Sequence, residues 1–266
     1  MLQTLRNAWR IEEIRRKILF TLLIILLYRL GNAIPVPYVN IAALQSYFAM
    51  LRNTVFGLMD VMSGGAFSNA TIFALSIQPY INASIIIQLL CIAIPALERM
   101  SKDEGEEGKK KLNTITRFVT VGLALLTSVG YYMLMRNTYR CLTADGETWY
   151  GAVVIIACYC AGASIIMWLG EKINENGIGN GISMILFANI VSAGPAIISS
   201  LISSFTSYFS QIANGEYIGI LWCVLTLVMI AAVCAIVVFV VFITDSERRL
   251  PVQYAKRVVG RKMYGG

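Results

Sequence analysis

Long runs of apolar residues dominate the chain, and polar residues gather in the short segments between them. Six such runs lie at residues 18–37, 71–97, 118–135, 149–170, 182–203 and 217–244. Each is long enough for a helix that crosses a bilayer, which takes about 20 residues. The runs are continuous and do not alternate with period two, so they indicate helices and not the strands of a membrane barrel. The pattern therefore predicts an all-α integral membrane protein with six transmembrane helices.

A seventh apolar segment is too short to span. It reads VFGLMDVMS at residues 55–63 and is followed by Gly64 and Gly65. Phe56, Met59 and Met62 are spaced so that they share one helical face. Short apolar segments beside a span are typically re-entrant or interfacial, and glycine tolerates the backbone angles of a sharp turn. From the residues alone, both a re-entrant helix and an ordinary external interfacial helix remain open.

Composition and charge agree with a membrane location. Hydrophobic residues make up 57% of the chain and charged residues 14%, whereas soluble domains carry about 25% charged residues. Eighteen Lys and Arg residues fall in the segments that would lie on the same side as the N-terminus, and three fall on the other side. The excess of positive charge predicts that both ends of the chain are cytoplasmic. Arg29 is the one charged residue inside a run, and we expect it to pair with backbone carbonyls or to reach toward the outer surface.

Candidate chemistry is sparse. The chain has no His, and its six Cys lack the spacing of a metal site, so we expect no metal, no cofactor and no enzymatic activity. The string GIGNG at residues 177–181 lacks the Lys of a phosphate-binding loop, and we interpret it as a turn between the fourth and fifth spans. The first run is too long for a cleaved signal peptide and lacks a small-residue cleavage pattern.

Several irregular strings resemble one family. They are MSGGAFSNATIFALSIQPYINASIIIQLL from Met62, MWLGEKINENGIGNGISMILFANIV from Met167 and ERRLPVQYAKRVVGRKMYGG from Glu247, together with YRLGNAIPVP and EGEEGKKKLNTITRF. In this order they resemble the SecY family, the central subunit of the bacterial protein-conducting channel. That family has ten spans in two inverted halves of five. The resemblance implies that this chain corresponds to the N-terminal part, with six of the ten spans.

The resemblance implies roles for particular residues. Residues 55–70 would be the plug, with Phe56, Met59 and Met62 in its helix and Gly64 and Gly65 as its hinge. The residues that match the apolar pore ring, which would exclude ions by dewetting, are Ile77, Ile81 and Leu186. Ile190 lies one helical turn after Leu186 and would contribute to the same ring. Asn82 matches a polar position of the lateral gate, where weak polar contacts between helices suit a gate that opens.

The resemblance also implies a function and partners. The chain would belong to a channel in the bacterial plasma membrane that secretes unfolded polypeptides and inserts membrane proteins. Its partners would be the small membrane subunits SecE and SecG, the SecA motor ATPase, the ribosome, signal sequences and membrane lipids. The residues implied to contact the ribosome or motor are Arg248, Arg249, Lys256, Arg257, Arg261 and Lys262.

We expect four regions: a cytoplasmic amphipathic segment at 1–17, the five-helix half with its plug at 18–203, an external loop with the sixth span at 204–244, and the basic cytoplasmic loop at 245–266.

A transporter and a membrane enzyme are the two alternative functions for such a chain. A half-size secondary transporter for a small solute, acting as a homo-oligomer, would also use broken helices and inverted repeats. Ion-coupled transport usually needs a carboxylate or histidine within the membrane, and the six runs contain none. A membrane enzyme would need a nucleophile with its base, or a metal site, and the sequence offers neither.

Overall fold

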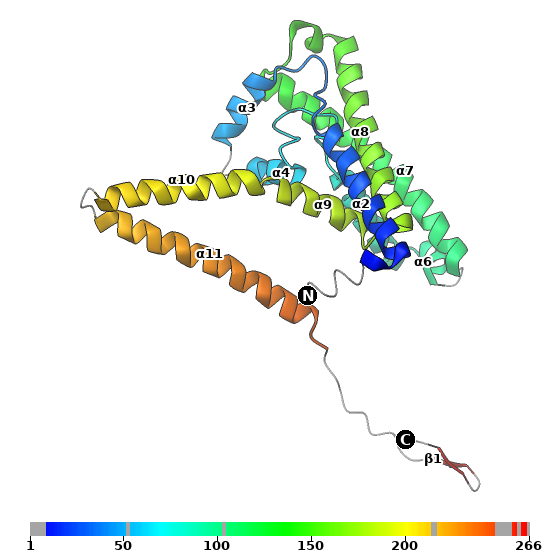
Figure 1. The fold of residues 1–266 in the computed structure, drawn as a ribbon. Coiled ribbons are helices and arrows are strands. Elements are labelled where there is room, and N and C mark those ends of the chain that lie inside the picture. Colours follow the sequence, from blue (N-terminus) through cyan, green and yellow to red (C-terminus); the bar gives the residue numbers. More distant parts are fainter. Residues whose placement is uncertain are drawn as a thin grey trace. The chain divides into compact units, whose positions relative to one another are not determined.

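The computed structural model describes residues 9–51, 54–102, 105–213, 217–247, 257–259 and 262–264. The chain divides into two compact units, residues 1–196 and 197–266. The helices of the first unit are α2 (Glu12–Gly31), α3 (Ile41–Met50), α4 (Val55–Ser63), α5 (Gln78–Ala93), α6 (Pro95–Lys102), α7 (Gly105–Met133), a π-helical turn (Leu134–Tyr139), a 3-10 turn (Ala144–Glu147), α8 (Trp149–Asn176) and α9 (Gly181–Ser192) (Figure 1).

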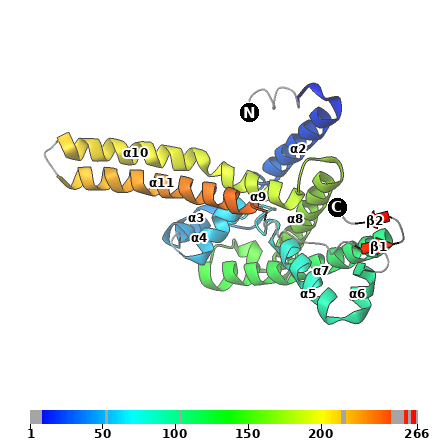
Figure 2. The same ribbon diagram turned by 90° about the horizontal axis from the view of Figure 1, so that it is seen from below.

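Helix α8 is the centre of the first unit. It packs against α7, α2, α5 and α9, and α7 packs in turn against α5 and α6 (Figures 1 and 2). One buried cluster lies between α3, α7, α8 and the segment that follows α4, and a second lies between α2, α8 and α9. The short helix α4 packs against α9. The first unit is therefore a helical body with α4 placed against the end of one of its helices.

Side-chain caps and glycine contacts explain how several helices begin and meet. The side chains of Thr148 and Asn180 accept hydrogen bonds from the first turns of α8 and α9, as preferred N-cap residues do. A Cβ on Gly162 of α8 would lie 2.0 Å from the carbonyl oxygen of Ile72. Only glycine lets the irregular segment before α5 lie this close to α8.

The second unit contains residues 197–213 of α10 (Gly194–Ala213), α11 (Tyr217–Thr244) and an antiparallel hairpin of β1 (Arg257–Val259) and β2 (Lys262–Tyr264). A Cβ on Gly219 of α11 would lie 2.8 Å from the carbonyl oxygen of Tyr208 of α10, so the two helices approach closely there. The apolar side chains along α11 are exposed within the unit. Such a surface suits contact with lipid or with other membrane helices.

Among the residues that the structure describes, four helical segments are long and apolar enough to cross a membrane: Gly105–Tyr139, Trp149–Asn176, Gly181–Ile212 and Gly219–Thr244. They correspond to the third, fourth, fifth and sixth predicted spans, and the predicted all-helical membrane fold is confirmed. The first predicted span becomes α2, which begins at Glu12 and carries charged residues in its first turns. The chain therefore does not break at residue 17 as the predicted regions implied.

Three predicted boundaries need correction. The second span was predicted over 71–97, but residues 72–77 form turns and the helix begins at Gln78. The irregular segment before this helix is bonded instead to the chain after α2: the amide of Val36 donates to the carbonyl of Ala70, and the amide of Ile72 donates to the carbonyl of Ile34. The fifth span is interrupted at Ala193, where Gly194 and Pro195 start α10. The predicted external loop at 204–216 is helical as far as Ala213.

Candidate functional site

Helix α4 presents one face to the rest of the first unit. Phe56, Met59 and Met62 are half-buried, whereas Leu58 and Val61 are 60% and 48% exposed. Phe56 packs against the buried cluster around α3 and α7. The predicted common face of these three apolar residues is therefore the face that contacts the body.

Two glycines end α4 and reverse the chain. Gly64 has φ +68° and Gly65 has φ +82°, both in the left-handed region that favours glycine. The amides of Gly64 and Gly65 donate to the carbonyls of Val61 and Asp60, which is a common way to end a helix. The sharp turn predicted at this pair is present.

The segment after the glycines is fixed to the body. The Asp60 carboxylate accepts from the Ser68 amide at 2.8 Å, and the Ser63 hydroxyl accepts from the Phe67 amide at 3.1 Å. The Phe67 ring stacks on Tyr131 with centroids 4.3 Å apart, and the Tyr131 hydroxyl donates to the Phe67 carbonyl at 2.6 Å. The chain is thus anchored immediately C-terminal to α4, while the outer face of α4 remains exposed.

A small cavity of about 30 Å³ lies behind α4. Met59 and Met62 from α4 and Leu186 from α9 contribute to its walls, together with Ser76 and Gln78 from the segment that leads into α5. The structure therefore brings two of the predicted plug residues together with one predicted ring residue. This cavity could not be predicted from the sequence, because its walls come from three separate parts of the chain.

A buried polar junction joins the end of α4 to α9. Asn189 of α9 is 0% exposed, and its Nδ2 donates to the carbonyl of Met62 at 2.9 Å and to the hydroxyl of Ser76 at 3.4 Å. Nη2 of Arg29 donates to the carbonyl of Ala188 at 3.2 Å. The predicted pairing of Arg29 with a carbonyl is confirmed, but Asn189 was missed. Its signal in the sequence was a lone amide within the apolar run SMILFANIV.

The four predicted ring residues differ in exposure. Ile77 is 1% exposed inside the cluster between α2, α8 and α9, and Ile81 and Leu186 pack against that cluster half-buried. Ile190 is 56% exposed. Ile77 comes immediately before α5, at the end of the irregular segment, and packs among core side chains. The predicted gate residue Asn82 is exposed on α5.

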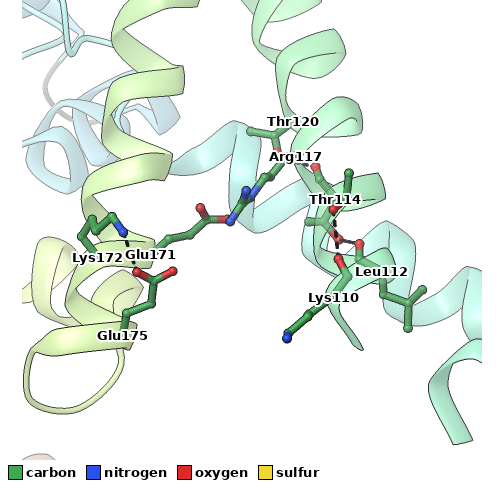
Figure 3. Close-up of polar contacts among 9 residues, drawn as sticks. Lys110, Leu112, Thr114, Arg117, Thr120, Glu171, Lys172 and Glu175 are labelled. Carbon is green, nitrogen blue, oxygen red and sulfur yellow. Dashed lines mark hydrogen bonds and ion pairs between the residues drawn. The ribbon is translucent and has the colours of Figure 1, made fainter. Parts of the chain in front are cut away.

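An ion pair between Arg117 and Glu171 joins α7 to α8, and a second pair lies within α8 (Figure 3). Nε of Arg117 lies 2.9 Å from Oε1 of Glu171, and Nζ of Lys172 lies 2.6 Å from Oε2 of Glu175 within α8. The Arg117 side chain is 49% exposed and that of Glu171 is 14% exposed. The Arg117–Glu171 pair is thus a partly exposed link between the two helices.

The structure describes two of the six basic residues that were predicted to contact the ribosome or motor. Arg248, Arg249, Lys256 and Arg261 lie outside the described residues, whereas Arg257 pairs with Tyr264 and Lys262 with Val259 in the register of the hairpin. Within the described ranges, no three His, Cys, Asp or Glu residues gather closely enough to hold a metal ion.

Spanning helices, a short helix against the end of α9 and an irregular segment before α5 define a multi-pass membrane protein with part of a translocon fold. The family model for SecY matches residues 71–266, and the chain belongs to the SecY family.

Relatives and solved structures agree. Protein translocase subunit SecY of Streptomyces galbus is 38% identical over 275 residues, covering 100% of this chain and 60% of the relative. The same subunit of Corynebacterium glutamicum is 39% identical, covering 98% of this chain and 57% of the relative. The chain thus spans about 60% of the length of these relatives.

Among solved structures, "Sec61 in the Canine ribosome-channel complex from the endoplasmic reticulum" and "The structure of a protein conducting channel" each match with a TM-score of 0.51 and 16% identity, over 76% of this chain and 42% of theirs. At that identity the likeness supports the fold alone.

Proposed function

We propose that the chain forms the N-terminal part of a protein-conducting channel through which unfolded polypeptides cross, or enter, a bacterial plasma membrane. Residues 55–70 form the plug of that channel, in which helix α4 is the part that moves and the segment after the glycine pair stays attached to the body. The observation that carries this proposal is the placement of α4: a short apolar helix ends in two left-handed glycines and lies over a cavity shared with Leu186. The segment after the glycines is bonded to the body and the outer face of α4 is exposed, which suits a helix that moves by rotation about the two glycines.

The other proposed assignments rest on membership of the SecY family. Ile77, Ile81, Leu186 and Ile190 line the constriction. Asn82, exposed on α5, contributes to the lateral gate through which signal sequences reach lipid. The membrane subunits SecE and SecG complete the channel, the ribosome or the SecA motor supplies the polypeptide and its driving force, and both ends of the chain are cytoplasmic. We assign the chain no catalytic role.

A functional test joins this chain to the remaining spans of a full-length relative. The joined protein should restore secretion in a bacterium depleted of its own SecY. Replacing Ile81 with Asn places a hydrogen-bonding group in the constriction, so the channel should conduct ions in planar bilayers while secretion persists. If conductance equals that of the parent although the protein is inserted, Ile81 does not face the pore.

The basic segment 245–266 is proposed to bind the ribosome or the motor. Reversing Arg257 and Lys262 to Glu should weaken binding in a pull-down, most clearly at low salt, because contacts with phosphate or acidic protein are screened by salt. The matched control reverses Lys109 and Lys110, which are exposed on α7 and give the same change in net charge. Equal binding by the 257/262 variant and the parent would remove this assignment.

A further inference from the structure

We propose that Asn189 is a positioning residue that latches α4 against α9, with Arg29 bracing the same junction. The proposal rests on the proposed function of α4 as a plug, and it assigns the contact that keeps the plug seated. It concerns residues that the plug, ring and gate assignments do not include.

The end of α4 depends on a donor from outside the helix. The last four carbonyls of a helix lack partners within it. In α4 the carbonyls of Asp60 and Val61 are satisfied locally by the glycine pair, but that of Met62 accepts from Asn189 of α9 at 2.9 Å. Asn189 is fully buried and Met62 half-buried, and a buried polar group that loses its partner is costly. Withdrawing α4 from α9 breaks the bond.

The guanidinium of Arg29 lies near the C-terminal ends of both α4 and α9. Its Nη2 donates to the carbonyl of Ala188, in the last turns of α9, and its Nη1 lies 3.3 Å from the position that a Cβ on Gly64 would occupy. Helices α4 and α9 end at Ser63 and Ser192. Because a helix C-terminus carries partial negative charge, one guanidinium favours the approach of both ends.

The side-chain oxygen of Asn189 weakens the contact between α4 and α9. Oδ1 of Asn189 is buried and has no hydrogen-bond partner within the described part of the chain. A buried acceptor without a partner disfavours the buried state. Separation of α4 from α9 exposes this oxygen to water, which offsets part of the bond lost to Met62. The seated position is therefore favoured only modestly, as suits a segment that a passing chain must displace.

Hydrogen–deuterium exchange of the whole chain in detergent tests the latch. Asn189→Ala removes the donor to Met62, so amides in 55–70 should exchange about tenfold faster or more, while those of 155–170 in α8 stay unchanged. Ser76→Ala removes only the 3.4 Å contact and should have a smaller effect on 55–70. Ser164→Ala, whose hydroxyl bonds within α8, is the control and should leave 55–70 unchanged.

Two results would overturn the latch. Exchange in 55–70 within twofold of the parent would show that Asn189 does not hold α4, and equal acceleration in α8 would show a general packing role. If Asn189→Ala does not fold, Asn189→Ser is too short to reach Met62 and carries the same expectation. The readout needs no secretion, so faster exchange in 55–70 together with failure of the joined protein to secrete would refute the channel proposal and leave the latch standing.

Discussion

Alanine substitutions at Gly64 and Gly65 can distinguish the cost of a left-handed backbone from the cost of crowding neighbouring side chains. Gly64 and Gly65 both have positive φ, so alanine at either position costs about 1–2 kcal/mol. At Gly65 the nearest atom to a new Cβ is 3.6 Å away, an ordinary contact. At Gly64 the Cβ would lie 3.0 Å from Oδ1 of Asn189 and 3.0 Å from Oγ of Ser192. Crowding a packed site adds about 1–3 kcal/mol.

We therefore expect Gly64→Ala to loosen α4 more than Gly65→Ala, by about 1–3 kcal/mol, which is about 5- to 150-fold in the opening equilibrium. Hydrogen–deuterium exchange of amides 61–69, measured for both variants under the same conditions, gives this ratio directly. Equal exchange in the two variants would mean that Gly64 does not lie against Asn189 and Ser192. Exchange at the parent's rate in both would refute the left-handed end of α4.

Three further predictions test the body of the first unit. Tyr131→Phe should destabilise the protein by about 1–3 kcal/mol in a denaturant titration, because it leaves a buried carbonyl without its 2.6 Å donor. Arg117→Gln should cost about 1 kcal/mol or less, and nothing at high salt, since its pair with Glu171 is partly exposed; a larger loss would contradict that reading. Burial raises the pKa of the Cys141 thiol, so near neutral pH maleimide should label it more slowly than it labels a cysteine placed at exposed Thr143 in a Cys141→Ser chain. Labelling of Cys141 should become faster as the pH rises.

The sequence predicted the features that depend on local pattern. The apolar runs at 118–135, 149–170 and 217–244 fall within helices, because hydrophobic length alone decides them. Helix α4 and its glycine turn were predictable for the same reason: the apolar spacing and the glycine pair both lie within a few residues.

Long-range contacts account for what the sequence did not predict. Residues 72–77 read as part of a span, but Ile72 pairs with Ile34 in the chain after α2, and this pairing delays the helix until Gln78. Asn189 looked like one more polar residue in an apolar run, because its partners Met62 and Ser76 are more than 100 positions away. Its role becomes visible only when α4 is seen against α9.

The most direct test of the central proposal is the ion conductance of the joined full-length channel in planar bilayers, with and without residues 57–65. The proposal predicts that the intact channel conducts poorly and that the deletion leaves the spans inserted but makes the channel leak, because the constriction loses the helix that covers it. Unchanged conductance of a properly inserted deletion variant, or loss of membrane insertion, would contradict the assignment of α4 as a plug.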